Sequence, residues 1–400
     1  MRRYLIFASA GIILLLSSID STAVAVAYPA IISDFDMSLI LAGWVLTSYQ
    51  LASVTALPLA GKISDSLGRR TTFLGFVSLF AVASLLCSFA PNAPSLIVFR
   101  VLQGLGGSGF MPAASIAVAE EFPNTRQRVI GLFSSIGPIG WILGPNLGGL
   151  MTSTLGWRSI FWINIPLCAI ALYIAARLMT DGKKKKVHID VVGAGLMASV
   201  LLVILLGLTE ISGKGTPWVL VASLISAGLI GAVVFWKRNI SVKDPLIPPE
   251  ILRERPFLAA NAYNVMYGGA LGATALIPFY AVSVYGMSTL QSGFIMTPRS
   301  IGMMVASGVV SFFLVRWGYR RPILVGTCMM IPSFAILAME LHNPSFMGSP
   351  ISDTALLMLV MAVVGTAMGI AQPASNNACI ELMPQHLGTI VALRVMVRQT

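Results

Sequence analysis

The sequence predicts an all-α membrane protein, and three observations support this fold class. The chain of 400 residues is 56% hydrophobic and 10% charged, whereas soluble globular proteins carry about 25% charged residues. Apolar segments long enough to cross a bilayer recur along the whole chain. The Lys and Arg residues gather in alternate loops between these segments. These observations exclude the water-soluble classes of protein.

Twelve apolar segments are the predicted membrane spans, and the loops between them are short. The first follows a basic start that is also typical of a signal peptide, but the apolar run continues past the cleavage site to Ile32 and favours a span. A thirteenth segment begins near Leu387 and is cut off at Thr400. The twelve complete segments are residues 5–31, 40–60, 72–90, 95–118, 129–152, 157–178, 189–209, 217–236, 257–286, 291–315, 322–341 and 354–377.

The basic residues also predict the orientation of the spans. If the N-terminus is cytoplasmic, most of the 26 Lys and Arg residues fall in cytoplasmic loops, and the outer loops hold only Arg158 and Lys214. We therefore expect a multi-pass protein of the cytoplasmic (inner) membrane with a cytoplasmic N-terminus. The formal charge of +11 reflects this topology, and no nucleic-acid partner is expected.

Two basic, cytoplasmic loops, "RLMTDGKKKKVHID" and "KRNISVKDPLIPPEILRERPF", divide the spans. We expect residues 1–182 to form an N-terminal six-helix bundle and residues 183–243 to form two linker helices with basic flanks. Residues 244–400 then form a C-terminal bundle whose last spans are missing. The loops "GKISDSLGRRTTFLGF" and "VRWGYRRPILVG" place a glycine near paired arginines at equivalent hairpins. Duplicated halves with a site between them are typical of secondary transporters.

The loop "GKISDSLGRRTT" is the most specific signal in the chain. Its two glycines permit a tight turn between helices, and its aspartate lies where the first arginine can reach it. Glu120 or Glu121, at the end of the fourth span, offers a third partner. Such a cluster can latch two helices together in one conformational state; the alternative is an ordinary basic loop. The predicted latch comprises Gly61, Asp65, Gly68, Arg69, Arg70 and Glu120.

The fifth span, "GPIGWILGPNLGGLM", combines small residues with a proline. Glycines four residues apart give a smooth helix face for close packing. Pro145 removes one backbone hydrogen bond and bends the span. Plain small-residue packing is the alternative interpretation. The residues concerned are Gly140, Gly144, Pro145, Gly148 and Gly149.

A carboxylate and a guanidinium lie within predicted spans, where a charge costs at least about 2.5–3.5 kcal/mol. Asp20 is in the first span and Arg100 in the fourth, at similar predicted depths. Burial favours the neutral form of a carboxylate and a nearby arginine favours the charged form. Balanced against each other, the two effects would let Asp20 load and release a proton. The alternative is a structural aspartate that only pairs with Arg100 or caps a kinked helix.

Other chemical signals are weak or absent in the sequence. The four cysteines and three histidines are scattered, so neither a metal site nor a disulfide framework is expected. "GLGGSG" fits the dinucleotide fingerprint but lies within a span and follows no strand. There is no phosphate-binding loop of the G-x-x-x-x-G-K-[ST] type, so energy should come from an ion gradient.

Two groups of polar and aromatic residues could line a cavity for an aromatic cation. One group lies in the second span and the other in the ninth. For each residue taken singly, ordinary packing is the favoured interpretation. The candidates are Trp44, Tyr49, Gln50, Asn261, Asn264 and Tyr267.

Four stretches together resemble the major facilitator superfamily. "GKISDSLGRR" matches its loop signature G-x-x-x-D-x-x-G-R-R/K, and "GWILGPNLGG" matches its antiporter motif G-x-x-x-G-P-x-x-G-G. "RVLQG" matches R-x-x-Q-G, and "IDSTAVAVAYP" matches L-D-x-T-x-x-x-x-A-x-P with Ile19 in place of leucine. The last motif and the two linker spans are similar to the fourteen-span drug:proton antiporter branch. Because this sequence stops in a thirteenth span, we expect a fragment of a longer protein or a truncated one.

The resemblance implies a major facilitator fold and proton-coupled efflux of drug-like amphipathic or cationic small molecules. Asp20 is then the proton-coupling carboxylate, Arg100 its electrostatic partner, the 61–72 loop the latch and the fifth span the gate hinge. The implied partners are the substrate, protons and the bilayer, without another cofactor, in a monomer that is not an enzyme. The alternatives are an exporter of a single metabolite or lipid, a membrane enzyme and a non-transporting sensor. The last two lack, respectively, a nucleophile motif and a signalling domain.

Overall fold

The computed structural model describes residues 1–122, 125, 129, 132–133, 136–181, 190–211, 217–242, 245–247, 249, 255–346, 349–382 and 394. Within these residues the chain is nearly all helical, and ten helices are long and apolar enough to cross a membrane. A bent pair of helices makes an eleventh candidate span. The predicted all-α membrane fold is therefore confirmed. The predicted thirteenth span lies outside the described residues, apart from Arg394.

The helices of the first half agree closely with the first six predicted spans. The third helix begins after Gly68, and the fourth begins with a capping box between Asn92 and Ser95. The sixth span is interrupted at Ile163 and so consists of two helices. The elements are α1 (Arg2–Phe35), α2 (Leu39–Leu67), α3 (Arg69–Ser88), α4 (Ala93–Glu121), α6 (Ile136–Leu155), α7 (Ser159–Trp162) and α8 (Asn164–Leu178). α6 is not among the ten candidate spans.

The remaining helices include the predicted linker pair. The predicted ninth span is broken into two helices that meet at 41°. Pro278 stands in the first turn of the second piece, where a proline is well tolerated but cannot continue a preceding helix. The elements are α9 (Val191–Ile211), α10 (Trp218–Ser241), α12 (Arg255–Ala275), α13 (Ile277–Tyr285), α14 (Thr289–Trp317), α15 (Arg320–Ala338), β1 (Ser345–Phe346), β2 (Ser349–Pro350) and α16 (Asp353–Leu382).

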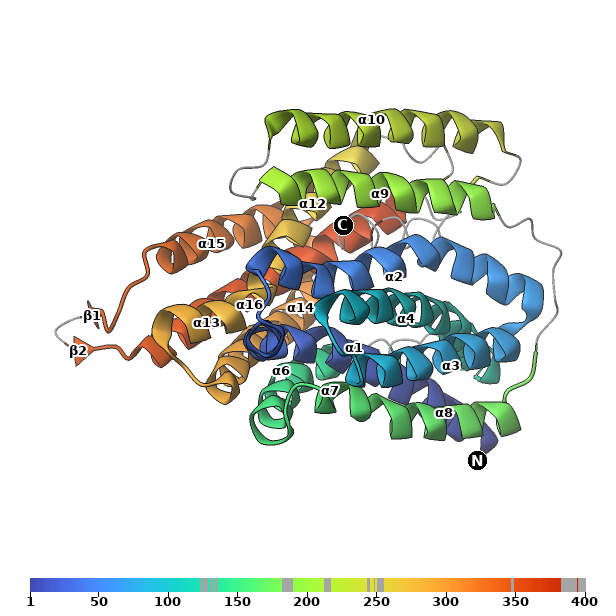
Figure 1. The fold of residues 1–400 in the computed structure, drawn as a ribbon, viewed down its shortest axis with the longest axis horizontal. Helices are drawn as coiled ribbons and strands as arrows, with labels where there is room; N and C mark the ends of the chain where they lie inside the picture. The colour runs from blue at the N-terminus through green and yellow to red at the C-terminus, as the bar shows by residue number, and fades with distance from the viewer. Residues whose placement is uncertain are drawn as a thin grey trace.

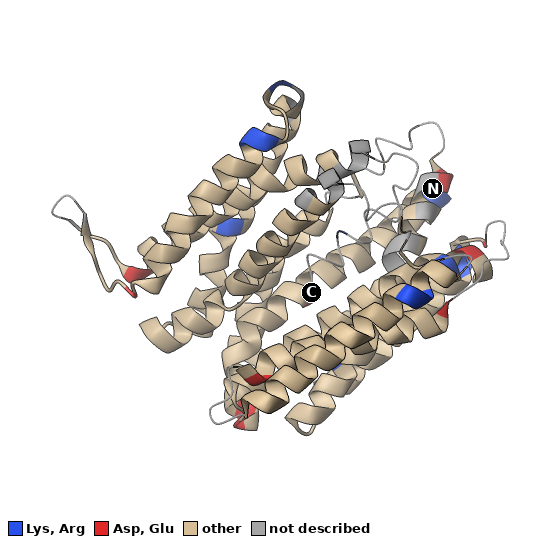
Figure 2. Ribbon diagram, turned by 90° about the horizontal axis from the view of Figure 1, so that it is seen from above, with Lys and Arg blue, Asp and Glu red and all other residues tan. Residues whose placement is uncertain are grey.

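Figure 1 shows two groups of packed helices, α1–α8 and α12–α16, with α9 and α10 side by side along the outside. α9 packs on α2, so the linker pair is attached to the first group. Apolar residues of α1, α3, α4 and α8 form one buried cluster, and residues of α12–α16 form another. In Figure 2 most charged residues lie toward the ends of the helices, with long uncharged stretches between them, as expected of spans in which intramembrane charges are rare.

The two groups meet through α6, which packs on both α1 and α14. α6 and α14 run antiparallel, since the end of α6 near Gly149 faces Leu290 and Trp141 faces Ser300. A second contact joins α1 to α13, where the rings of Tyr28 and Phe279 meet edge to face at 5.8 Å. Among the described residues, both contacts lie toward the end where α14 begins, so the two groups are packed together at that end.

Candidate functional site

Asp20 and Arg100 form an ion pair in the interior of the first helix group. Arg100 Nη1 lies 2.9 Å from Asp20 Oδ2. The side chain of Asp20 is fully buried, and that of Arg100 is 1% exposed. The structure thus brings together the two charged residues that the sequence places inside separate spans. Each charge compensates the other, because an isolated buried charge would be far more costly.

Two amide side chains complete the surroundings of the carboxylate. Gln103 Nε2 donates to Asp20 Oδ1 at 3.0 Å, and Asn164 Nδ2 donates to the same oxygen at 2.9 Å. Both amides also donate to Ser84 Oγ, at 2.9 and 3.1 Å. These five buried residues, Asp20, Ser84, Arg100, Gln103 and Asn164, are called the buried hub below. They come from α1, α3, α4 and α8, so the hub ties four helices to one carboxylate.

Arg100 is held in place by α2 as well as by the hub. Its Nε donates to the carbonyl oxygen of Val45 at 3.2 Å, and its Nη1 donates to Gln103 Oε1 at 2.7 Å. The guanidinium carbon lies 4.2 Å from the centre of the Tyr49 ring. A desolvated cation over an aromatic face gains about 2 kcal/mol. Tyr49, predicted as a cavity residue, therefore contacts the charge pair.

The other predicted cavity residues lie in two places. Trp44 and Gln50 are half-buried on α2. Asn261, Asn264 and Tyr267 are buried on α12. The Asn264 amide donates to the carbonyl oxygen of Arg394 at 2.6 Å, and the Tyr267 hydroxyl donates to Gln372 Oε1 at 3.3 Å. The α2 set thus lies in the first helix group and the α12 set in the second.

The glycines of α6 allow a close approach to α1. A Cβ atom at Gly140 would stand 2.9 Å from the carbonyl oxygen of Leu15, and one at Gly148 would stand 2.7 Å from Ala23 Cα. A Cβ at Gly144 would overlap Thr22 and stand 2.9 Å from the carbonyl oxygen of Ile19. The stripe of residues 140, 144 and 148 is therefore an interface of small residues with α1.

The opposite face of α6 contacts α14 in the second helix group. Asn146 and Thr297 exchange hydrogen bonds, with Nδ2 donating to Oγ1 at 2.8 Å and Oγ1 to Oδ1 at 3.0 Å. The carbonyl oxygen of Pro145 lies against Gly293, and Gly149 faces Leu290. The fifth span is thus packed between the two halves, which is the position a hinge requires. The sequence motif offered no signal for the Asn146–Thr297 pair.

The predicted latch is assembled partly as expected. Arg69 forms an ion pair with Glu120, which joins the start of α3 to the end of α4. Arg70 Nη2 donates to the carbonyl oxygen of Ala176 at 2.8 Å. Asp65 is exposed and forms no ion pair in the part of the chain that the structure describes. Arg69 thus pairs with Glu120, the predicted third partner, while Asp65 is close enough to act on Arg69 through its charge without forming an ion pair among the described residues.

Gly68 makes the turn between α2 and α3, and Asp181 completes it. Gly68 has φ 97°, which only glycine adopts without strain, whereas Gly61 lies within α2 and takes no part in the turn. Gly68 offers no capping side chain, and the backbone N–H and hydroxyl of Thr71 both donate to Asp181, each at 3.1 Å. A carboxylate at a helix N-terminus is favourable. Sequence reasoning missed Asp181, because it is 110 residues from its partner.

The Arg69–Glu120 pair predicts a conformational effect without a folding defect. Because the Glu120 side chain is 53% exposed, breaking the pair should change stability by about 1 kcal/mol or less. We expect Arg69→Ala and Glu120→Gln to shift the equilibrium between conformations and to impair transport while the protein still reaches the membrane. Accessibility of single cysteines from each side of the membrane measures this. The exchanged pair Arg69→Glu with Glu120→Arg should restore the native pattern; unchanged accessibility in both single variants would disprove the latch.

Comparison with known proteins agrees with this architecture. The family model described as Major Facilitator Superfamily matches residues 10–400. The chain is 30% identical over 398 residues to the "Multidrug transporter protein MdtP" of Bacillus subtilis (strain 168), covering 98% of this chain and 72% of that protein. It is 31% identical to a "Multidrug resistance protein B homolog" of Mycobacterium tuberculosis (strain ATCC 25618 / H37Rv), covering 94% of this chain and 70% of that protein.

Two further matches extend the comparison. The "Tetracenomycin C resistance and export protein" of Streptomyces glaucescens is 30% identical and is covered over 68% of its length, against 91% of this chain. Among solved structures, the nucleoside transporter NupG superposes with a TM-score of 0.67 at 14% sequence identity. That superposition covers 100% of this chain and 87% of NupG, and at this identity it shows the fold alone. The chain therefore belongs to the Major Facilitator Superfamily of multi-pass membrane transporters, which carry small molecules.

Proposed function

We propose that this chain is a proton-coupled exporter of drug-like amphipathic or cationic small molecules, and not an enzyme. The observation that carries the proposal is the buried hub around Asp20. A fully buried carboxylate that four helices share is sensitive to any movement among those helices. Relatives named for multidrug transport and for antibiotic resistance and export support the substrate class.

The hub supplies what proton coupling needs. Three donors, on Arg100, Gln103 and Asn164, bind the carboxylate of Asp20 inside the bundle. Separation of α4 or α8 from α1 would remove donors from this carboxylate, so a movement of these helices changes the contacts of the group proposed to carry the proton. Asn164 Oδ1 is buried without a hydrogen-bond partner among the described residues, so the hub also has an acceptor for a protonated group.

Alternating access would follow from motion at the interfaces that α6 forms with α1 and with α14. In this conformation the halves are packed together through α6–α14 and α1–α13. Because α6 contacts both α1 and α14, a rocking of the halves moves the helix that carries Asp20. A cationic cargo that competes for the same carboxylate would release the proton and make exchange obligatory.

The membrane topology is part of the same proposal. We propose a cytoplasmic N-terminus in the cytoplasmic membrane, with the basic ends of the bundle on the inside. The boundaries between bundles and linker helices, at residues 182/183 and 243/244, fall outside the described residues. The proton-coupling, latch and hinge residues all lie in one chain, so the proposed transporter is a monomer.

Dye export from a reconstituted system tests the proposal. The purified chain is placed in liposomes with rhodamine 6G, and a pH gradient is applied; we expect dye movement against its gradient that stops when an ionophore collapses the pH difference. Competition by chemically unrelated amphipathic cations distinguishes a multidrug exporter from an exporter of one metabolite or lipid. Dye movement at the same rate with and without the pH gradient would contradict proton coupling.

A further inference from the structure

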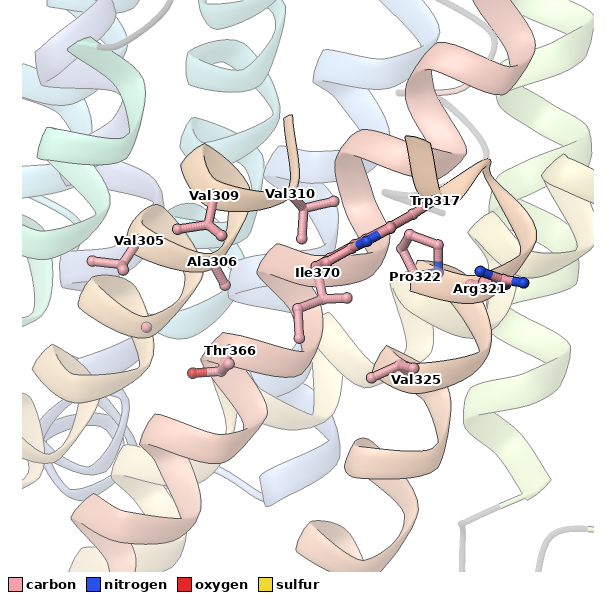
Figure 3. A pocket seen from close by; sticks show the side chains of 11 residues that line it. Val305, Ala306, Val309, Val310, Trp317, Arg321, Pro322, Val325, Thr366 and Ile370 are labelled. Atoms are coloured by element: carbon pink, nitrogen blue, oxygen red, sulfur yellow. The ribbon is translucent and has the colours of Figure 1, made fainter. Parts of the chain in front are cut away.

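A groove of about 570 Å³ lies between α14, α15 and α16 in the second helix group (Figure 3). Val305, Ala306, Val309, Val310 and Trp317 line it from α14, at helical spacing on one face. The lining extends from Gly302 to Trp317, or roughly 22 Å of helix at 1.5 Å per residue. The groove is therefore long and mainly apolar.

Among the described residues, one side of the groove is open. Val305 is 56% exposed, Val309 48%, Trp317 45% and Val325 of α15 49%. α14 and α15 both pack tightly on α16, through Gly365 and Gly326 respectively, yet they make few contacts with each other. α14 and α15 are both candidate membrane spans, so the groove lies at the depth of the bilayer.

One end of the groove is basic. Arg321 lines it there, and Figure 3 places Arg321 near Trp317 and Pro322, away from Val305 and Thr366. Arg316 and Arg320 are exposed in the same α14–α15 turn. None of the three arginines forms an ion pair within the described ranges. Trp317 is of the type that anchors helices at the membrane surface.

We propose that this groove binds an anionic phospholipid, with an acyl chain along α14 and the phosphate at Arg321. Its length exceeds the roughly 15 Å depth of one leaflet, so it accommodates a whole acyl chain. Basic pockets between spans on the cytoplasmic side are suited to anionic headgroups. A lipid bound there would fill the space between α14 and α15 and stabilise the packing of the second helix group. The site is separate from the buried hub, and it does not depend on proton coupling.

Quenching of Trp317 by brominated lipids tests the site in the full chain. The protein is placed in phosphatidylcholine nanodiscs containing dibrominated phosphatidylglycerol or dibrominated phosphatidylcholine, and Trp317→Phe defines the signal of the other tryptophans. We expect phosphatidylglycerol to quench Trp317 at a mole fraction at least about tenfold lower, because a charge-assisted bond has this strength. Arg321→Gln should remove most of that preference, whereas Arg177→Gln, an exposed arginine elsewhere, should retain it.

Filling the groove gives a second measurement. Ala306→Phe places a ring in the groove, and we expect it to weaken quenching by phosphatidylglycerol. If this variant does not accumulate in the membrane, the comparison of Arg321→Gln with the wild-type protein tests the site. Equal quenching by both lipids in the wild-type protein, or an unchanged preference in Arg321→Gln, overturns the proposal. Absence of quenching by either lipid also overturns it, because protein then covers the groove.

Discussion

Asp20→Asn should abolish proton-driven export while leaving some binding of substrate. The substitution removes the ionisable group and keeps the size of the side chain. It also leaves Arg100 buried without a counter-charge, which should lower the free energy of unfolding by about 3–5 kcal/mol. Asp20→Glu should retain part of the activity, because it keeps the charge but displaces it from the amides of Gln103 and Asn164. Initial rates of dye export under an imposed pH gradient measure both effects.

A double variant separates loss of coupling from loss of stability. Asp20→Asn combined with Arg100→Gln removes both charges, so we expect recovery of thermal stability relative to Asp20→Asn alone. Proton-driven export should remain absent in the double variant. Recovery of export together with stability would mean that the ion pair is only structural.

Gly144→Leu should block transport and destabilise the protein. Even a single methyl group at this position overlaps Thr22, and a leucine side chain would push α6 away from α1. Overpacking of this kind typically costs about 1–3 kcal/mol. Gly144→Ala should show a smaller defect than Gly144→Leu, and transport rate with thermal stability reports on both.

Gly137 provides the matched control on the same helix. A Cβ there would stand 3.7 Å from Ser18 Oγ, an ordinary contact distance, so Gly137→Ala should be tolerated. Thr22→Ala should partly rescue Gly144→Ala, because it removes the hydroxyl that the new methyl group meets. Equal transport by Gly144→Leu and Gly137→Ala would show that close packing of α6 on α1 is unimportant.

The sequence was sufficient for the pair at the centre of the hub. A charge in an apolar span is visible without a structure, and both Asp20 and Arg100 were found in this way. Ser84 and Asn164 carried no such signal, because single hydroxyl and amide groups are common in membrane helices. Their roles arise from contacts 80 and 144 residues apart, which only the packing of α3 and α8 creates.

The loop motif shows the same limit at a finer scale. Spacing placed Arg69 within reach of Asp65, but the ion pair of Arg69 is with Glu120 of α4, a contact that depends on how α3 packs on α4. The positive φ of Gly68 was predictable from its place between two helices; the cap that Asp181 provides was not. The groove beside Arg321 was likewise hidden, because it depends on how α15 leans away from α14.

The most direct test of the coupling role is proton release on substrate binding. Purified protein in weakly buffered detergent solution is mixed with rhodamine 6G, and a pH indicator follows the protons released at a pH where dye transport is active. We expect release with binding in the wild-type protein and none in Asp20→Asn. The same release from Asp20→Asn, with dye bound, would contradict the assignment of Asp20 as the proton-carrying group.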